Sequence, residues 1–406
     1  MTSPADALRQ RIASREARVG IIGLGYVGLP LALSFAEKGF AVAGFDTDPH
    51  KIARLSRRES YITHIPAARV AAAGRFEAVA GFDALGGQDV VIVCVPTPLT
   101  PQLQPDMSYI ETTAREIRDR LRPGQLVILE STTYPGTTDE LLRGILEETG
   151  LKSGTDFFLA FSPEREDPGN KDFGLSTIPK VVGGVDPVSG DLAEALYAQV
   201  VAKVVRVSTA RAAEATKLVE NIFRAVNIAL VNELKVVYDR MGIDIWEVLD
   251  AAASKPFGFM RFNPGPGWGG HCIPLDPFYL SWKAREYGLS PKFIELAGEV
   301  NRDMPRWVVD KVVGALNAAG LPVKGSRVLL LGMAYKKDIG DTRESPALEI
   351  LELLAGLGAA VAYHDPHVPE LPRTRHHAGR AGMRSVALTA EAVAGFQAVV
   401  VVTDHA

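Results

Sequence analysis

Short apolar runs alternate with longer amphipathic stretches through the first part of the chain. The runs share the length of a single strand and lie at 18–22, 41–45, 90–95, 126–129 and 157–161. Strands buried on both faces of a parallel sheet have this continuous apolar character. Because a helical pattern over 29–38 separates the first two runs, we predict that the chain begins as a doubly wound α/β domain.

The middle of the chain has the pattern of long helices instead. Residues 209–241 contain neither glycine nor proline and carry an apolar face, which predicts one long helix that ends before Gly242. Further helical patterns follow at 245–253, 278–287 and 291–316. We therefore expect a helical middle domain between the first domain and the C-terminal part.

The C-terminal part repeats the opening pattern. Residues 327–332 resemble 18–23, and residues 360–365 resemble 41–46, including the closing aspartate. The prediction is thus an α/β protein with two Rossmann-like domains joined by a long central helix and a helical middle domain. The expected divisions are an N-terminal arm at 1–16, then domains at 17–207, 208–318 and 319–406.

Composition excludes several classes of protein. The 406 residues contain 44 Lys and Arg against 48 Asp and Glu, a net charge of −4, so no basic surplus indicates nucleic acid or an anionic membrane. Two cysteines cannot form a disulfide framework, which indicates a reducing compartment. The N-terminus lacks the apolar core of a signal peptide, and no apolar run is long enough to span a bilayer. A cytoplasmic protein is expected.

A glycine-rich motif joins the first predicted strand to the first predicted helix. Residues 23–28 read GLGYVG, and Asp46 follows the second strand, 23 positions after the first glycine. In this context GxGxxG is the fingerprint of a dinucleotide site, with the pyrophosphate at the helix N-terminus. Asp46 would accept hydrogen bonds from the ribose hydroxyls and repel a 2′-phosphate, so we predict NAD rather than NADP.

Polar residues stand just beyond the ends of the later strands. Ligands of open parallel sheets bind at this edge, so Thr132 and Glu164 are better site candidates than an average Thr or Glu. Cys94 continues the apolar run at 90–95, and we interpret it as a small buried hydrophobe.

The second cysteine, Cys272, lies in a loop of unusual composition. Residues 265–277 place four glycines before the thiol and prolines after it, which predicts a stiff loop that presents the sulfur. A thiolate beside NAD can attack an aldehyde, and hydride loss from the adduct gives a thioester that water releases as an acid. Lys217 is a candidate source of positive charge, and Asp276 or Glu164 could activate the water.

These residues have two other interpretations. His271, Cys272 and Asp276 could ligate a metal, but no further Cys pair or His spacing accompanies them, so no metal is expected. Lys217 and Asn221 are four residues apart and share one helix face, which by itself is more often a solvated edge.

Taken together, the motifs resemble the NAD-dependent UDP-sugar 6-dehydrogenases, which oxidise nucleotide sugars by four electrons. The matching motifs occur in the family's order: GLGYVG at 23–28, PTP at 96–98, EST at 130–132, SPE at 162–164, KLVEN at 217–221, GGHC at 269–272 and GMAYKKDIGDTRES at 332–345. Residues 256–280 and SPEREDPGN at 162–170 look most like the UDP-N-acetylhexosamine branch, and its UDP-N-acetylglucosamine 6-dehydrogenases especially. Leu275 stands where UDP-glucose dehydrogenases usually carry lysine.

The resemblance implies a role for each matching residue. The catalytic set would be Cys272 as nucleophile, Lys217 and Asn221 at the developing oxyanion, Asp276 and Thr132 with water, and Glu164 as general base. The set implied to hold NAD is Gly23, Gly25, Tyr26, Val27, Gly28, Asp46, Lys51, Thr97, Thr132 and Arg343. The set implied to hold the UDP-sugar is Glu164, Arg165, Lys217, Asn221, Lys255, Phe257, Gly269 and Lys336.

The leading hypothesis is oxidation of C6 of UDP-N-acetylglucosamine to the uronic acid. The alternatives are the same chemistry on UDP-N-acetylmannosamine, UDP-N-acetylgalactosamine or UDP-glucose, and a non-catalytic relative that binds NAD or nucleotide sugar. The chain stops directly after a strand at 399–402, where family members usually continue, so a shortened UDP-binding domain is expected. The resemblance also implies a homodimer or a larger homo-oligomer.

Overall fold

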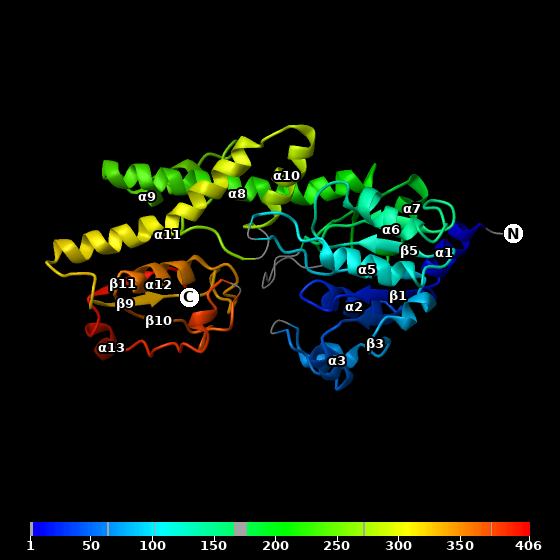
Figure 1. The fold of residues 1–406 in the computed structure, drawn as a ribbon, viewed down its shortest axis with the longest axis horizontal. Helices are drawn as coiled ribbons and strands as arrows, with labels where there is room; N and C mark the ends of the chain where they lie inside the picture. The colour runs from blue at the N-terminus through cyan, green and yellow to red at the C-terminus, as the bar shows by residue number, and fades with distance from the viewer. Residues whose placement is uncertain (1–2, 63–64, 101, 166–176, 271–272, 375) are drawn as a thin grey trace. The chain divides into compact units, whose positions relative to one another are not determined.

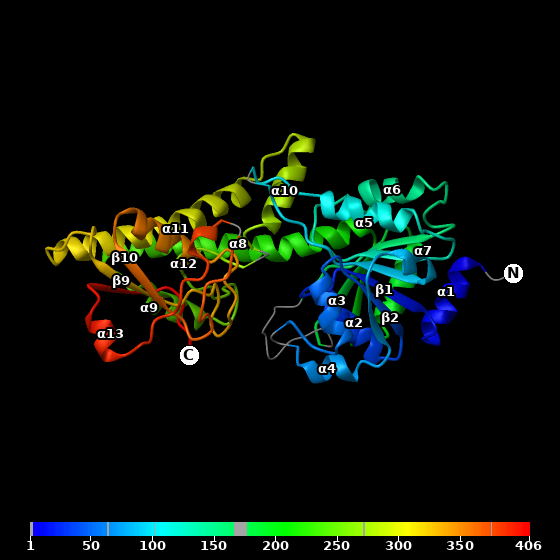
Figure 2. The ribbon, with the colours of Figure 1, turned by 60° about the horizontal axis from the view of Figure 1, so that its bottom comes forward.

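The computed structural model describes residues 3–62, 65–100, 102–165, 177–270, 273–374 and 376–406. The chain divides into two compact units, Met1–Val219 and Glu220–Ala406. Helix α8 (Ala210–Met241) begins in the first unit and ends in the second as one continuous helix, as the sequence predicts (Figures 1 and 2).

The first unit is built on an eight-stranded sheet in the order β3-β2-β1-β4-β5-β6-β7-β8. Its strands are β1 (Arg18–Ile22), β2 (Ala41–Phe45), β3 (Phe76–Val79), β4 (Val90–Val93), β5 (Leu126–Leu129), β6 (Phe158–Phe161), β7 (Lys180–Gly184) and β8 (Val204–Val207). Every neighbouring pair is parallel except β6 and β7. The α/β fold is therefore confirmed, whereas β3, β7 and β8 were not predicted from the sequence.

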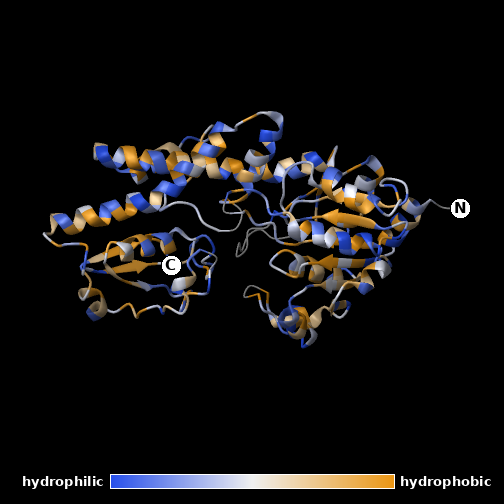
Figure 3. Cartoon of the chain, in the orientation of Figure 1, coloured by the Kyte–Doolittle hydropathy of each residue, from blue (hydrophilic) through white to orange (hydrophobic). Residues whose placement is uncertain are grey.

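Helices cover both faces of this sheet. They are α1 (Pro4–Ala13), α2 (Gly28–Glu37), α3 (Pro49–Ser56), α4 (Ala67–Ala72), α5 (Ser108–Arg118), α6 (Arg143–Glu147) and α7 (Pro187–Tyr197), with short helices η1 (Asp83–Gly87) and η2 (Thr137–Leu142). Because strand side chains alternate between faces, Val19 and Ile21 join a core with α1, α2 and α7, whereas Ile22 joins one with α5, α6 and the start of α8. Figure 3 shows these strands as predominantly hydrophobic.

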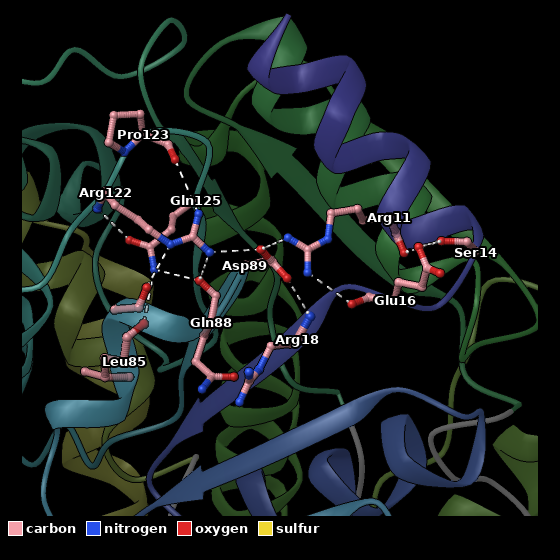
Figure 4. Close-up of polar contacts among 11 residues, drawn as sticks. Arg11, Ser14, Glu16, Arg18, Leu85, Gln88, Asp89, Arg122, Pro123 and Gln125 are labelled. Carbon is pink, nitrogen blue, oxygen red and sulfur yellow. Dashed lines mark hydrogen bonds and ion pairs between the residues drawn. The ribbon is translucent and has the colours of Figure 1, made fainter. Parts of the chain in front are cut away.

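An ion-pair cluster ties the N-terminal helix to the end of the sheet opposite the glycine motif. The buried carboxylate of Asp89 accepts from Arg11 at 2.7 Å and from Arg122 at 2.9 Å, and its other oxygen accepts from the amide of Arg18 at 2.8 Å (Figure 4). Leu8 and Ile12 of α1 are also buried in the core. The N-terminal arm expected at 1–16, for which a helix was one possibility, thus contains the helix α1, and this helix packs on the core.

The second unit contains a three-stranded parallel sheet and the helices of the middle region. Its strands, in the order β10-β9-β11, are β9 (Arg327–Leu331), β10 (Ala360–His364) and β11 (Ala398–Val401). Its helices are α9 (Ile245–Ala253), α10 (Asp276–Ala284), α11 (Lys292–Ala318), α12 (Pro346–Gly356) and α13 (Ala390–Ala394), with short helices η3 (Arg285–Tyr287) and η4 (Ala378–Arg380). Residues of α11, α12 and the sheet form one hydrophobic core.

The predicted repeat between the two units is present at the level of single hydrogen bonds. The amide of Gly23 after β1 donates to the carbonyl of Phe45 at 2.8 Å. In the same way, the amide of Gly332 after β9 donates to the carbonyl of His364 at 2.8 Å. Both glycines have left-handed φ angles, +92° and +90°. In both units an aspartate follows the second strand, Asp46 and Asp365.

No helix among the residues that the structure describes combines the length and the apolar character needed to cross a membrane.

Candidate active site

The three glycines of the motif at 23–28 have three different surroundings. A side chain on Gly23 would meet the carbonyl oxygen of Cys94 at 2.4 Å, and one on Gly28 would meet the carbonyl oxygen of Gly23 at 1.9 Å. A side chain on Gly25 would meet no protein atom within 4 Å. The outer two glycines are thus needed for close packing within the chain, whereas Gly25 leaves the backbone open to a ligand. Tyr26 and Val27 lie between them, directly before α2.

Asp46 is held beside this loop in a fixed orientation. Its Oδ2 accepts from the amide of Leu24 at 2.9 Å and from Nζ of Lys51 at 2.9 Å, and its Oδ1 accepts from the amide of Asp48 at 2.9 Å. The carboxylate is 8% exposed. The structure therefore joins the predicted residues Asp46 and Lys51 to the glycine loop, in an arrangement that fits the adenosine ribose of NAD.

Two predicted threonines meet at the carboxyl edge of the sheet. The hydroxyl of Thr97, which follows β4, donates to the carbonyl of Thr132, which follows β5, at 2.6 Å. Cys94 follows β4 rather than lying inside it, and it packs against the core. Burial and the nearby carboxylate of Glu130 raise the pKa of the Cys94 thiol well above its usual range, which supports its interpretation as structural.

Glu164 lies just after β6 beside a buried cation that the sequence analysis missed. Nζ of Lys180 is 2.9 Å from Oε2 of Glu130 and 3.3 Å from Oε2 of Glu164. The other Glu164 oxygen accepts from the amide of Arg165 at 2.7 Å, and the Arg165 guanidinium donates to the carbonyl of Pro179. Burial opposes a charge on Lys180, but the two carboxylates outweigh it and raise the pKa of the ammonium.

The face of α8 carries the next candidates. Lys217 is buried, and none of the hydrogen bonds and ion pairs recorded within the described part of the chain involves its side chain. One turn later, the buried amide of Asn221 donates to Oδ2 of Asp276 at the start of α10. Arg224 donates to Oδ1 of Asn221. Arg224 was not predicted, although its place one turn after Asn221 is visible in the sequence.

The glycine-rich loop before Cys272 packs tightly within the second unit. A side chain on Gly269 would lie 2.6 Å from Cβ of Tyr335, and one on Gly267 would lie 2.8 Å from the carbonyl oxygen of Asn301. The amide of Gly270 donates to the carbonyl of Arg343 at 3.0 Å. Positions 267 and 269 therefore have no room for a side chain, because the loop lies against Asn301 and the segment at 332–346. His271 and Cys272 lie outside the described residues.

The remaining predicted residues lie at three places in the second unit. Arg343 forms a two-pronged pair with Asp341, with a shortest distance of 2.6 Å. Lys255 lies over the ring of Phe257 at 4.9 Å, and Phe257 is 71% exposed. Lys336 is partly buried in the loop after β9. Of these residues, Lys336 and Arg343 lie in the segment that follows β9 at its carboxyl end, and both are of a type suited to phosphate.

One group among the described residues has the composition of a metal site. Asp338, His367 and His405 bring one potential ligand atom each within 4.8 Å of one another. His405 already uses both ring nitrogens, since Nδ1 accepts from the amide of Asp338 and Nε2 lies 3.0 Å from Asp365. A metal would have to displace one of these bonds, so this geometry favours the hydrogen-bonded arrangement.

Comparison with known proteins gives matches along almost the whole chain. The UDP-glucose/GDP-mannose dehydrogenase family matches through its NAD binding domain at 17–201, its central domain at 211–303 and its UDP binding domain at 329–406. The chain is 39% identical to the UDP-N-acetyl-D-glucosamine 6-dehydrogenase of Pseudomonas aeruginosa over 87% of this chain and 84% of that protein.

Two solved structures have the same fold over similar lengths. The UDP-D-ManNAc dehydrogenase of Pyrococcus horikoshii superposes with a TM-score of 0.85 at 34% identity, covering 96% of this chain and 89% of that one. The NDP-N-acetyl-D-galactosaminuronic acid dehydrogenase of Methanosarcina mazei Go1 gives 0.83 at 33% identity, covering 100% and 89%.

Proposed function

We propose, since the chain belongs to the UDP-glucose/GDP-mannose dehydrogenase family, that it oxidises C6 of UDP-N-acetylglucosamine to the uronic acid. It is an NAD-dependent oxidoreductase whose residues 17–201 form the family's NAD binding domain. The observation that carries the chemical proposal is the buried Asn221–Asp276 pair at the end of the loop that bears Cys272. The choice of sugar is supported by the 39% identical relative from Pseudomonas aeruginosa.

In the proposed reaction, one water and two NAD convert the C6 alcohol into a carboxylate, two NADH and three protons. Bound NAD supplies a hydride acceptor for each of the two oxidation steps. Between those steps the Cys272 thiolate adds to the C6 aldehyde to form a thiohemiacetal. Loss of the second hydride leaves a thioester, and water cleaves its C–S bond to release the acid and the thiol.

The described residues have separate tasks in this proposal. The Lys217 ammonium and the Asn221 amide stabilise the C6 oxygen as it gains negative charge. Asp276 orients the Asn221 amide and, with Thr132, holds the water, while Glu164 takes its proton. The residues assigned to UDP-sugar binding in this proposal are Arg165, Lys255, Phe257, Gly269 and Lys336. Arg343 is assigned to NAD binding.

A panel of four substrates with NADH counted per sugar tests this proposal. UDP-N-acetylglucosamine should be used with the highest kcat/KM and yield two NADH per sugar. A yield of one NADH per sugar, with aldehyde accumulating, would contradict the four-electron reaction. Binding of the ligands without NADH formation from any of the four sugars would favour a non-catalytic relative. Cys272→Ser should abolish acid release, and acid formed at the original rate would remove the thioester.

The same chemistry on UDP-N-acetylmannosamine or UDP-N-acetylgalactosamine is the second candidate. It is favoured by the structural likeness to a UDP-D-ManNAc dehydrogenase and to an NDP-N-acetyl-D-galactosaminuronic acid dehydrogenase. A higher kcat/KM for either sugar would replace UDP-N-acetylglucosamine in the proposal, and UDP-glucose, disfavoured by Leu275, completes the panel.

A further inference from the structure

A buried lysine lies between two carboxylates at the carboxyl edge of the large sheet. The side chain of Lys180 is 3% exposed, that of Glu130 is 0% exposed and that of Glu164 is 13% exposed. A buried ammonium is retained in a protein only where opposite charge and hydrogen bonds replace its hydration. One carboxylate would be enough for neutrality, so the second contact requires a separate explanation.

The antiparallel pairing of β6 and β7 places this lysine opposite Glu164. Phe161 pairs with Gly183 in the sheet. Strand β6 ends at Phe161, but the chain still lies beside β7 at the next residue, since the Ser162 hydroxyl donates to the carbonyl of Val181 at 2.8 Å. Because β7 runs back along β6, its first residue, Lys180, lies next to the segment that leaves β6, and its ammonium is 3.3 Å from Oε2 of Glu164.

Glu130 is the fixed partner of Lys180, and Glu164 is the partner that remains accessible. Glu130 also accepts from the hydroxyl of Tyr197 of α7, and the Lys180 ammonium lies 5.3 Å from the centre of the Tyr197 ring. Among the residues that the structure describes, the Cys94 thiol after β4 and Arg165 after β6 are further titratable or charged groups beside Lys180 and Glu164. Glu130 therefore stabilises the buried ammonium of Lys180, and the positive charge of that ammonium also acts on the Glu164 carboxylate.

We propose that Lys180 is a positioning residue that holds the Glu164 carboxylate ionised and aimed at the reacting water. This inference rests on the proposed function, because it takes Glu164 as the base for thioester hydrolysis. Oε2 of Glu164 is fixed by Lys180 and Oε1 by the amide of Arg165, so the carboxylate has one orientation. Glu130 competes for the same ammonium and thereby sets how strongly Glu164 is held in its charged form.

Two substitutions should move the pH dependence of acid release in opposite directions. Lys180→Met removes the cation, so Glu164 ionises less readily. The acidic limb of the profile of acid-release rate against pH should therefore move up by about one to three pH units. Glu130→Gln removes the competing carboxylate, so the limb should move down. Lys180→Arg should return the limb towards its original position. Acid release is measured in single turnovers from about pH 3.5 to 9, so that a limb below the ordinary carboxyl pKa is visible, with KM for NAD and the melting temperature recorded for each variant.

The outcomes separate this inference from the function on which it rests. If Glu164→Gln releases acid at the original rate, Glu164 is not the base and the proposed function loses that assignment. If Glu164→Gln is slow but Glu130→Gln leaves the limb in place, the role of Lys180 is overturned and the function stands. Should Lys180→Met fail to fold, Glu130→Gln still decides, because it retains both Lys180 and Glu164. A purely structural role would change melting temperatures without shifts of opposite sign.

Discussion

At the scale of single residues, Glu214 is a buried acid that the proposed reaction does not use. It lies in the first turns of α8, one turn before Lys217. Its carboxylate accepts from the amides of Gly136 and Thr138, at 2.7 and 2.9 Å, and from the hydroxyl of Thr138 at 2.7 Å. Glu214 therefore fixes the start of the helix that bears Lys217 to the segment after β5. Burial, which outweighs these hydrogen bonds, raises its pKa to about 7.

Glu214 should make the protein less stable as pH rises. Between the ordinary pKa of 4.5 and the folded value of about 7, the folded state holds a proton that the unfolded state has lost. Stability from this group is thus complete below pH 4.5 and is lost as pH rises through 7, by about 3 kcal/mol in total. Glu214→Gln, which stays neutral, should lack this loss in urea unfolding from pH 5 to 8.

The matched control for this prediction is Glu233→Gln, which changes an exposed acid on the same helix. Its unfolding free energy should follow that of the original protein at every pH. Parallel curves for all three proteins would show that Glu214 is ionised throughout the range, contrary to the prediction.

At the scale of elements, the sequence predicts strands well where burial alone determines them. The apolar runs that became β1, β2, β4, β5 and β6 are visible because hydrophobic residues fill them. Strand β7 was missed because it begins with a charged residue, Lys180, whose partners lie 50 and 16 positions earlier in the chain. In the site, helix spacing predicts the shared face of Lys217 and Asn221, whereas the contact of Asn221 with Asp276 spans 55 positions and leaves no local pattern.

The Asp89 cluster should contribute strongly to the attachment of α1. Removing this carboxylate leaves the Arg18 amide without its acceptor and two guanidinium groups without their counter-charge. Because the arginines are about 40% exposed and can be rehydrated, Asp89→Ala should cost about 2 kcal/mol of unfolding free energy, below the range for fully buried pairs. Urea unfolding at pH 7 measures this loss.

Asp191→Ala provides the comparison within the same region. It removes the exposed partner of Arg9, which also lies on α1, at a distance of 3.8 Å. Such a pair contributes little, so the variant should unfold with the original protein. Equal losses from both substitutions would show that burial of Asp89 has no special importance.

At the scale of the whole molecule, the two sheets share a pattern but offer different chemistry. Asp365 is fully buried, and its oxygens already accept from the amides of Met333, Ala334, His367 and Val368 and lie beside Nε2 of His405. Asp46 has fewer partners and stays slightly exposed. Asp365 thus has no capacity left for ribose hydroxyls, so the repeated sequence gives a second Rossmann-like sheet without a second dinucleotide site.

Helix α8 also carries an apolar strip that stays about half exposed in the described part of the chain, even though the ring of Phe223 lies 5.7 Å from that of Phe262. The strip consists of residues spaced by four or seven positions, which places them on one helix face, and each is 44% to 62% exposed: Val219, Phe223, Leu230, Val237 and Met241. Figure 3 shows such orange positions among the polar ones along α8. We infer that the same strip of a second copy covers it, because a twofold interface requires a self-complementary surface.

Leu230→Lys, at the centre of this strip, should convert a homodimer into monomers. Burying each Leu230 contributes about 2 kcal/mol, and twofold symmetry changes both copies, so the dissociation constant should rise by about a thousandfold. Light scattering after gel filtration at micromolar concentration measures the mass. Leu357→Lys is the matched control, because Leu357 is 48% exposed at the end of α12 and does not belong to the strip on α8, and it should leave the dimer intact. A monomeric original protein, or a Leu230→Lys variant that remains dimeric, would show that this face of α8 does not join two copies.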